Sequence, residues 1–388
     1  MRFGMLPKSI KEKLKSGKNI WVHAASSGEV KCMAPLIARL KEKYPGRNIV
    51  LSVTTANGMK IAVKVAPDVT AFYLPLDIWF FMRPVVRVVN PEVLVVAETE
   101  IWPSLFYAVK KQGGKIAIVN GRFSKKNLGK YKLIRPFISK VLRLVDAFGM
   151  RNAGDLEYLK AIDKNVQNAC VTGDLKYETV YVDPEKYEWL RSDLAPYLNK
   201  KVVVAGSVHY KEAPELLAAV LVAEKYSKDL TFIVAPRFLE EAAEFAELFT
   251  AADIRTVKRS DLKGNNKSGV VILDTMGELS AAYGLCSAAF VGGSLVDGIG
   301  GHNMLEPLFF GKKAIFGSFY MNFQEIGNEV LNASLGVKAS NGRELGEALI
   351  GCLKENPRET FGKTEAFLKK RQGSLARNVE MIAKVLEG

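Results

Sequence analysis

A single carboxylate, Glu29, stands where an expected strand gives way to an expected helix. Residues 19–22 (NIWV) suit a buried strand, residues 26–28 (SSG) suit a turn, and the apolar spacing of the residues that follow is that of a helix. In an open α/β sheet such turns lie at the carboxyl ends of the strands, where ligands bind. Glu29 is therefore a candidate for acid–base chemistry. The alternative is a structural acid in a first helical turn, where the helix dipole favours negative charge.

Three further charged residues follow strand-like segments of the first half. Residues 95–105 (VVAETEIWPSL) end a strand with Glu98 and Glu100, which point the same way if the strand persists. Residues 171–178 (VTGDLKYE) end in a loop that carries Lys176. These three residues join Glu29 as candidate catalytic residues.

The strongest local motif is a glycine-rich run in the second half, residues 292–307 (GGSLVDGIGGHNMLEP). Glycines and Asn303 before a helix allow the backbone to approach an anion closely, with the helix N-terminus aimed at it. The run predicts a phosphate site, with Glu306 facing the ribose hydroxyls. It matches neither GxxxxGK[ST] nor GxGxxG, and glycines that serve only packing and a tight turn are the alternative.

Three shorter loops of the second half also follow strands. Residues 205–209 (AGSVH) and 235–237 (APR) place Ser207 and Arg237 at the carboxyl end of the expected sheet. Residues 276–278 (MGE) lead into a helix whose first backbone N–H groups are free. These loops complete the expected ligand-binding edge of the second half.

The elements that must position these residues alternate between apolar strands and helical patterns. This alternation indicates parallel sheets with crossover helices, and hence an α/β fold of two doubly wound Rossmann-like domains that face a central cleft. We expect the domains at residues 1–180 and 181–388, because residues 183–200 are charged and contain two prolines. The last helix, from about residue 358, is a candidate to return to the first domain. The expected strands are residues 19–22, 48–54, 92–98, 115–120, 201–207, 230–236, 269–274, 287–293 and 313–317.

Positive charge is concentrated in the first half. Residues 1–180 hold 30 basic and 14 acidic residues, whereas residues 181–388 hold 25 and 27. Residues 121–143 contain eight basic residues and no acidic one, with aromatic side chains between them. This asymmetry predicts a polyanionic partner, which is nucleic acid, anionic lipid or a phosphorylated acceptor; a solvated helix face is the alternative. The candidate contacts are Lys125, Lys126, Lys130, Lys132 and Arg135.

Several classes of protein are disfavoured. The 4 cysteines are far apart without a CxxC pair, and only 3 histidines are present, so neither a structural zinc nor a disulfide framework is expected. No Asp-x-Asp pair indicates a divalent ion. No apolar stretch is long enough to span a membrane, and a reducing cytoplasm suits the free cysteines.

Taken together, the motifs resemble those of the 3-deoxy-D-manno-octulosonic acid (Kdo) transferases, which move Kdo from CMP-Kdo to lipid A precursors on the GT-B fold. The resemblance covers nearly the whole chain and keeps the family's order. Two departures are Phe238, where a histidine commonly follows APR, and a glycine run one residue longer than usual. The motifs are RFGMLP (2–7), HAASSGEV (23–30), LPLD (74–77), ETEIWP (98–103), NGRFS (120–124), TGDLKYE (172–178), GSVHYKE (206–212), APR (235–237), MGEL (276–279), GGHNMLEP (300–307) and NFQEI (322–326).

The resemblance implies an inverting transfer in lipopolysaccharide core biosynthesis, from a CMP-Kdo donor to the lipid A precursor lipid IVA. One base on the acceptor side is then needed, which is Glu29. Because the departing CMP gains only a monoester charge, cations and dipoles can replace a metal, with Lys176 as the first candidate and no cofactor. Glu98 and Glu100 would orient the donor, the acceptor or Lys176. The implied nucleotide contacts are Pro236, Arg237, Met276, Gly277, Glu278, Asn303, Met304, Leu305 and Glu306.

The resemblance also implies a location. The family often has a membrane anchor upstream of the RFG motif, which Met1 immediately precedes in this chain. We therefore expect peripheral attachment of this chain to the anionic cytoplasmic face of the bacterial inner membrane. Two alternatives remain: another GT-B nucleotide-sugar transferase or epimerase, and, more remotely, a nucleic-acid-binding protein, although nucleic acid is not the expected partner.

Overall fold

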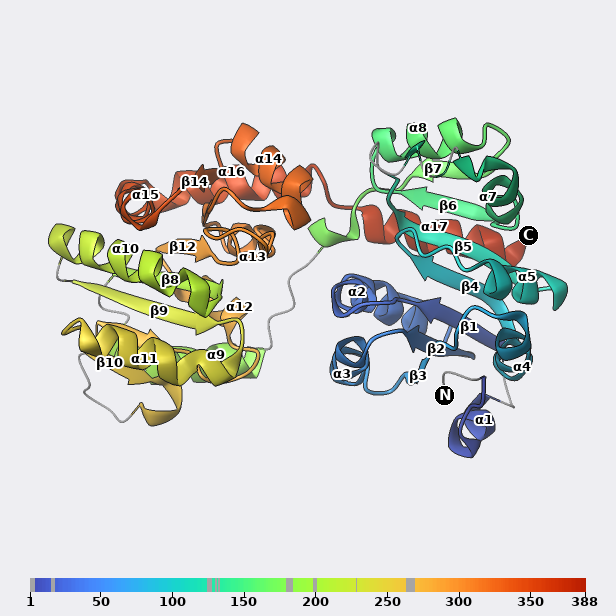
Figure 1. Cartoon of the computed structure of the whole chain (residues 1–388), viewed down its shortest axis with the longest axis horizontal. Coiled ribbons are helices and arrows are strands. Elements are labelled where there is room, and N and C mark those ends of the chain that lie inside the picture. Colours follow the sequence, from blue (N-terminus) through green and yellow to red (C-terminus); the bar gives the residue numbers. More distant parts are fainter. Residues whose placement is uncertain are drawn as a thin grey trace. The chain divides into compact units, whose positions relative to one another are not determined.

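The computed structural model describes residues 4–14, 18–123, 128–129, 131, 133–178, 184–197, 201–227, 229–262 and 269–388. The chain divides into two compact units, of which the first comprises Met1–Glu178 with Arg371–Gly388 and the second Thr179–Lys370. Each unit contains one parallel sheet with helices packed on it (Figure 1).

The sheet of the first unit has seven parallel strands in the order β3-β2-β1-β4-β5-β6-β7. The order reverses between β1 and β4, which are hydrogen-bonded neighbours. Ligands of doubly wound folds bind at the carboxyl end of such a switch point. The strands are β1 (Lys18–His23), β2 (Arg47–Val53), β3 (Thr70–Tyr73), β4 (Pro91–Ala97), β5 (Lys115–Gly121), β6 (Ala147–Met150) and β7 (Ala169–Val171).

Helices connect these strands, and the last helix of the chain belongs to this unit as well. That helix, α17 (Ser374–Glu387), packs against β5 and against the helix that follows β1. The other helices are α1 (Lys8–Leu14), α2 (Ser27–Lys43), α3 (Ala56–Val65), α4 (Trp79–Val89), α5 (Pro103–Lys111), α7 (Arg135–Leu142), α8 (Ala153–Ile162) and the 3-10 turn η1 (Leu175–Tyr177).

The central strands are mainly apolar because both faces of the sheet are covered. Along β1, Ile20 and Val22 belong to one buried cluster, whereas Trp21 between them belongs to the other. Strands buried on both faces read as continuous hydrophobic runs rather than as an alternating pattern. The same burial explains why the sequence of β4 is easy to recognise.

The second unit has its own seven-stranded parallel sheet, in the order β10-β11-β9-β8-β12-β13-β14. Its switch point lies between β8 and β12, which pair in parallel. The strands are β8 (Lys201–Val208), β9 (Leu230–Pro236), β10 (Thr256–Lys258), β11 (Val270–Ile272), β12 (Ala288–Val291), β13 (Ala314–Phe316) and β14 (Gly336–Lys338).

Helices and short 3-10 turns make the connections of the second unit (Figure 1). The helices are α9 (Pro184–Leu194), α10 (Ala213–Tyr226), α11 (Ala242–Ala251), α12 (Leu279–Leu285), α13 (Leu305–Phe309), α14 (Gln324–Asn332), α15 (Gly342–Lys354) and α16 (Pro357–Lys369). The 3-10 turns are η2 (Ala195–Tyr197), η3 (Tyr210–Glu212), η4 (Leu239–Glu241), η5 (Arg259–Asp261) and η6 (Met321–Phe323).

The predicted fold class, α/β with doubly wound parallel sheets, is confirmed. Each of the nine expected strands overlaps an observed one. The structure adds β6 and four short strands at the sheet edges, β3, β7, β10 and β14. Short edge strands are partly exposed, so their sequences carry little of the apolar pattern that identifies a central strand.

Candidate functional site

Glu29 lies in the first turn of α2, directly after the carboxyl end of β1. Its Oε2 accepts a hydrogen bond from the Ala25 N–H at 2.8 Å, and its Oε1 accepts one from the Ser26 hydroxyl at 2.8 Å. The Ser26 hydroxyl oxygen in turn accepts the Glu29 N–H at 3.3 Å. Ser26 and Glu29 therefore form a close variant of a capping box, which holds the carboxylate in one position.

The surroundings of Glu29 change its acidity. Burial raises its pKa to about 7, against the hydrogen bonds from Ser26 and Ala25 that favour the charged form, and the negative charges of Glu100 and Glu98 raise it further. A carboxyl group with a pKa near 7 can take up and release a proton at neutral pH. The geometry and electrostatics of Glu29 thus suit a general base.

Glu98 and Glu100 follow β4 at the other side of the switch point. The strand ends at Ala97, and Glu98 adopts a left-handed backbone with φ of 54°. The strand does not persist, so the two acids are placed by a tight turn rather than by strand alternation. Burial raises the pKa of Glu100, and the nearby Glu98 charge adds to this effect.

Lys176 lies in η1, after the carboxyl end of β7. The Asp174 carboxylate accepts the Lys176 N–H at 2.9 Å, and the buried Asn120 side chain accepts the Leu175 N–H at 3.0 Å. Burial raises the pKa of the Cys32 thiol on α2, and the charges of Asp174, Lys176, Glu98 and Glu29 all act on it. The four predicted catalytic residues therefore gather around the first turns of α2.

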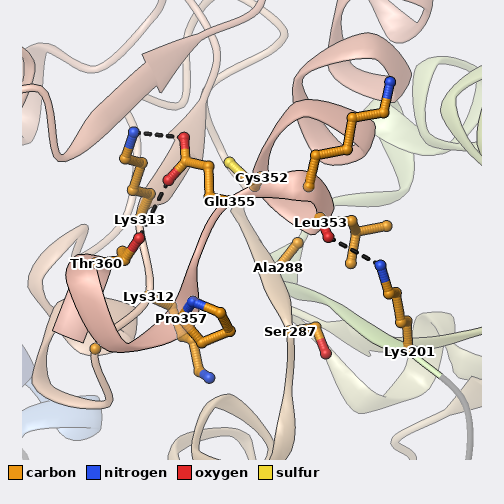
Figure 2. A pocket seen from close by; sticks show the side chains of 12 residues that line it. Lys201, Ser287, Ala288, Lys312, Lys313, Cys352, Leu353, Glu355, Pro357 and Thr360 are labelled. Carbon is orange, nitrogen blue, oxygen red and sulfur yellow. Dashed lines mark hydrogen bonds and ion pairs between the residues drawn. The ribbon is translucent and has the colours of Figure 1, made fainter.

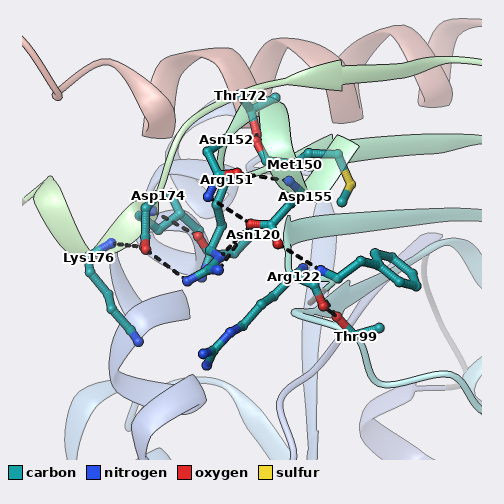
Figure 3. Close-up of polar contacts among 12 residues, drawn as sticks. Thr99, Asn120, Arg122, Met150, Arg151, Asn152, Asp155, Thr172, Asp174 and Lys176 are labelled. Atoms are coloured by element: carbon teal, nitrogen blue, oxygen red, sulfur yellow. Dashed lines mark hydrogen bonds and ion pairs between the residues drawn. The ribbon is translucent and has the colours of Figure 1, made fainter. Parts of the chain in front are cut away.

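A buried ion-pair network, which the sequence did not indicate, supports this region (Figure 3). Arg151, after β6, contacts the Asp155 carboxylate at 3.0 Å and the Asp174 carboxylate at 3.5 Å. Asp155 also accepts the Phe123 N–H at 2.9 Å. Arg151 and Asp155 thereby join the loops that follow β5, β6 and β7.

In the second unit, the loops after β8 and β12 are joined by one fully buried acid, Glu212. Its carboxylate accepts backbone N–H groups of His209 at 3.0 Å, Gly293 at 2.6 Å, Ser294 at 3.0 Å and Leu295 at 2.9 Å. Sequence reasoning did not select Glu212, although it ends the GSVHYKE motif directly before α10. Glu212 holds a loop that begins 81 residues later in the sequence, so a local motif does not reveal this contact.

The glycines and Ser207 allow the backbones of these two loops to come close. A Cβ on Gly292 would lie 2.6 Å from the Ser207 carbonyl oxygen, and Ser207 itself adopts a left-handed φ of 54°. Beyond this approach, His209 Nε2 and His302 Nε2 lie 2.9 Å apart. The glycine-rich run is therefore held in a defined shape at the switch point of the second sheet.

The predicted nucleotide contacts around β9 and α12 differ in exposure. Pro236 is buried at the end of β9, whereas Arg237 and Met276 are exposed. Gly277 has a left-handed φ of 83°, as a tight turn requires. Glu278 is buried, and its carboxylate accepts hydrogen bonds from Arg259 at 3.3 Å and from the Thr275 hydroxyl, so it also has a structural role.

The end of the glycine-rich run leads into α13, a helix of 5 residues. Asn303 accepts the Leu305 N–H at 3.1 Å, while the side chains of Met304 and Leu305 are fully buried in the unit's interior. These two residues can meet a ligand only through their backbone. Glu306 is partly buried. Burial raises the pKa of Tyr283, and the charge of Glu306 raises it further.

Of the predicted basic contacts, only Arg135 lies within the described residues; Lys125, Lys126, Lys130 and Lys132 lie outside them. Arg135 begins α7 on an exposed surface that also carries Leu133 and Phe137. Phe80 on α4 is 80% exposed. No helix in the described part of the chain is both long and apolar enough to cross a membrane.

A pocket of about 470 Å³ lies away from the predicted site residues, beside the first residues of β8 and β12 (Figure 2). Two of its lysines have partners: Lys313 is paired with Glu355 at 2.6 Å, and Lys201 donates to the Leu353 carbonyl at 2.9 Å. Among the described residues, no group of three or more His, Cys, Asp or Glu side chains could hold a metal ion.

Comparison with known proteins finds one family model and several curated relatives that match this chain. Residues 1–179 match the family model for 3-deoxy-D-manno-octulosonic-acid transferase (kdotransferase). A bifunctional glycosyltransferase/methyltransferase of Fusobacterium nucleatum is 33% identical over 374 residues, covering 92% of this chain, which spans 56% of that protein's length. A 3-deoxy-D-manno-octulosonic acid transferase of Haemophilus influenzae is 28% identical, covering 95% of this chain and 88% of the relative.

Solved structures of low sequence identity share the fold. The UDP-GlcNAc 2-epimerase of Neisseria meningitidis is 14% identical with a TM-score of 0.64, covering 95% of this chain and 99% of the epimerase. A glycosyltransferase of Rickettsia africae is 13% identical with a TM-score of 0.60, covering 96% and 98%. These likenesses confirm the predicted GT-B fold class.

Proposed function

We propose that this chain, whose residues 1–179 match the family model for 3-deoxy-D-manno-octulosonic-acid (Kdo) transferase, transfers Kdo from CMP-Kdo to a phosphorylated lipid A precursor, with inversion at the anomeric carbon. The acceptor is lipid IVA, a tetraacylated, bisphosphorylated disaccharide. The observation that carries the chemistry is Glu29, a half-buried carboxylate with a pKa of about 7 at the switch point of the first sheet.

In the proposed reaction, an acceptor hydroxyl oxygen attacks the anomeric carbon of Kdo. The bond from that carbon to the phosphate oxygen breaks, CMP leaves with the electron pair, and Glu29 takes the hydroxyl proton. A single displacement of this kind inverts the configuration. Lys176 is the candidate cation for the negative charge that develops, and Glu98 and Glu100 orient the substrates or Lys176.

The second unit is proposed to hold the nucleotide. The exposed Arg237 and the backbone N–H groups after Met276 are available to a phosphate, and the glycine-rich run offers close approach at the switch point. Asn303 and Glu306 supply polar groups for the ribose and base. Glu212 supports this surface by holding the glycine-rich run in place.

The acceptor and the site of action are part of the same proposal. A lipid acceptor lies in a membrane, and the basic first half suits the anionic cytoplasmic face of the inner membrane. The exposed apolar side chains of Phe80, Leu133 and Phe137 support peripheral contact with that surface.

The proposed transfer needs no metal ion. We expect turnover to be unchanged by EDTA, because fixed cations and dipoles can stabilise the monoester leaving group. The measurement is the initial rate after dialysis against EDTA. Loss of activity that magnesium or manganese restores would contradict this part of the proposal.

The test of the function is incubation of the protein with CMP-Kdo and lipid IVA, followed by mass spectrometry of the lipid. The proposal expects added Kdo mass, and the number of increments gives the number of sugars transferred. UDP and GDP sugars in parallel reactions test the alternative of another GT-B transferase. Turnover of one of these, without turnover of CMP-Kdo, would refute the proposal.

A further inference from the structure

Arg122 has a fixed backbone and an unpaired side chain. Its N–H donates to the Thr99 hydroxyl at 3.2 Å, and its carbonyl accepts a hydrogen bond from the same hydroxyl. The next residue, Phe123, is buried and donates its N–H to Asp155. The exposed Arg122 guanidinium has no hydrogen bond or ion pair within the described residues.

Thr99 connects Arg122 to the acidic part of the site. It lies between Glu98 and Glu100, so the Thr99 hydroxyl ties the loop after β5 to the turn after β4. Both carboxylates act electrostatically on Glu29. Arg122 is therefore held beside the same group of acids that surrounds the proposed base.

Lys176 reaches this region from another loop. Figure 3 shows the Arg122 and Lys176 side chains extending on the same side of the buried network, away from Arg151 and Asp155. Arg151 binds Asp174 and Asp155, and these two acids hold the backbones of Lys176 and Phe123 respectively. One buried network thus fixes the loops of both cations.

A charged guanidinium without a partner, on a fixed backbone, is suited to bidentate binding of a carboxylate or a phosphate. The guanidinium is exposed, so it does not carry the cost of burying a charge. A second cation, on a separate loop that the same network holds, increases the attraction for an anion. The pair lies on the unit that carries Glu29, where the acceptor hydroxyl must be deprotonated if the proposed function is correct.

We propose that Arg122 and Lys176 form a binding site for a substrate oxyanion, a phosphate or a carboxylate, which orients the substrate relative to Glu29. This inference rests on the proposed function. The acceptor's phosphate and the carboxylate of Kdo share the required chemistry. Arg151 and Asp155 are positioning residues of this site, because they act through the two loops.

The experiment compares the wild type with Arg122→Gln, Arg122→Lys and the control Arg87→Gln. Arg87 is exposed near the C-terminal end of α4, which leads into the start of β4. It therefore lies at the amino ends of the strands, opposite the carboxyl ends that Glu29 and Arg122 follow. Steady-state kinetics are measured with CMP-Kdo and with bisphosphorylated or dephosphorylated tetraacyl disaccharide. Thermal unfolding of each variant checks that the fold is retained.

We expect Arg122→Gln to raise one substrate KM about 10–100-fold, because it removes a charge-assisted hydrogen bond. Arg122→Lys should restore part of the loss, and Arg87→Gln should match the wild type. An increase for the bisphosphorylated acceptor alone identifies the acceptor phosphate, whereas an increase for CMP-Kdo identifies the Kdo carboxylate. Unchanged KM values for both substrates would overturn the inference.

If the proposed function is wrong, a separate binding measurement still tests the anion site. If the wild type transfers no Kdo, that function is wrong, and calorimetric titrations with the bisphosphorylated disaccharide and with free Kdo then test the anion site for both oxyanions. Binding that Arg122→Gln weakens tenfold or more supports the site. Absent binding, or equal binding by the wild type and Arg122→Gln, rules it out.

Discussion

At the scale of single residues, Glu29 combines two roles that are usually treated as alternatives. Its carboxylate oxygens accept hydrogen bonds at the start of α2, as a structural helix cap does. These bonds favour the charged form, whereas burial favours the neutral form and prevails, raising the pKa to about 7. The cap fixes the carboxylate in position, and burial adjusts its proton affinity.

The substitution Glu29→Gln separates these roles. The amide keeps the shape and can accept one of the two hydrogen bonds, but it cannot take a proton from the acceptor hydroxyl. We expect transfer to fall about 10²–10⁴-fold, with CMP affinity and the thermal unfolding midpoint close to the wild type. Turnover near the wild-type rate would exclude Glu29 as the base.

The pH dependence follows from the raised pKa of Glu29. Because only the unprotonated carboxylate accepts a proton, kcat/KM should fall tenfold per pH unit below about 7 and level off above it. Ser26→Ala removes a hydrogen bond that favours the charged form of Glu29. It should therefore raise the pKa of Glu29 further and move the fall in kcat/KM to higher pH. If kcat/KM of Ser26→Ala falls over the same pH range as that of the wild type, Glu29 is not the titrating group.

At the scale of elements, each sheet places some of its candidate residues at its switch point. Glu29 and Glu98 follow β1 and β4 in the first unit. In the second unit, Ser207 lies near the end of β8 and the glycine-rich run follows β12. Crossover connections diverge at such a point and leave space for a ligand. In the second unit this arrangement depends on Glu212, which joins the two loops.

Glu212→Gln tests that dependence. An amide offers one acceptor oxygen where the carboxylate offers two, and its NH₂ group faces backbone N–H donors. We expect the free energy of unfolding to fall by about 1–3 kcal/mol for the donors left unsatisfied, and CMP to bind more weakly. Denaturant unfolding and calorimetry measure the two effects.

The control for this substitution is Glu247→Gln, at an exposed acid on α11. It should change neither stability nor CMP affinity, because surface substitutions away from packed or bonded groups have small effects. Wild-type CMP affinity in Glu212→Gln would show that the nucleotide does not depend on the shape of the glycine-rich run.

At the scale of the whole molecule, the charge is distributed unequally between the two halves of the sequence. The first half has a net charge of +16 and the second half −2, from the counts of basic and acidic residues. The first unit also exposes Phe80, Leu133 and Phe137. A basic sequence half that also exposes apolar side chains suits an anionic bilayer, where each Lys or Arg near the surface contributes roughly 1 kcal/mol.

We therefore expect the protein to sediment with anionic vesicles at low salt and to be released as salt rises, since salt screens exposed charges. Replacing Lys125, Lys126 and Lys130 by Glu should raise the KM for vesicle-borne acceptor and leave the KM for CMP-Kdo unchanged. The control replaces the exposed Lys225, Lys338 and Lys369 of the second unit by Glu. Vesicle binding that is indifferent to salt and to both sets would contradict membrane docking.

The sequence by itself determined the fold class and the positions of the central strands. Strands such as β4 and β9 are buried on both faces, so their apolar character is a local property that the sequence displays directly. The motifs likewise indicated Glu29 and the glycine-rich run, because turn residues and helix starts are determined by near neighbours in the chain.

Only the tertiary structure decided the environment of these residues. The left-handed turn at Glu98, the pairing of Arg151 with Asp155 and Asp174, and the four N–H groups on Glu212 could not be predicted. A carboxylate's partners and its loss of water depend on segments that are distant in sequence, and local patterns do not specify them. For that reason the sequence indicated where Glu29 lies, whereas the fold determined that its pKa is about 7.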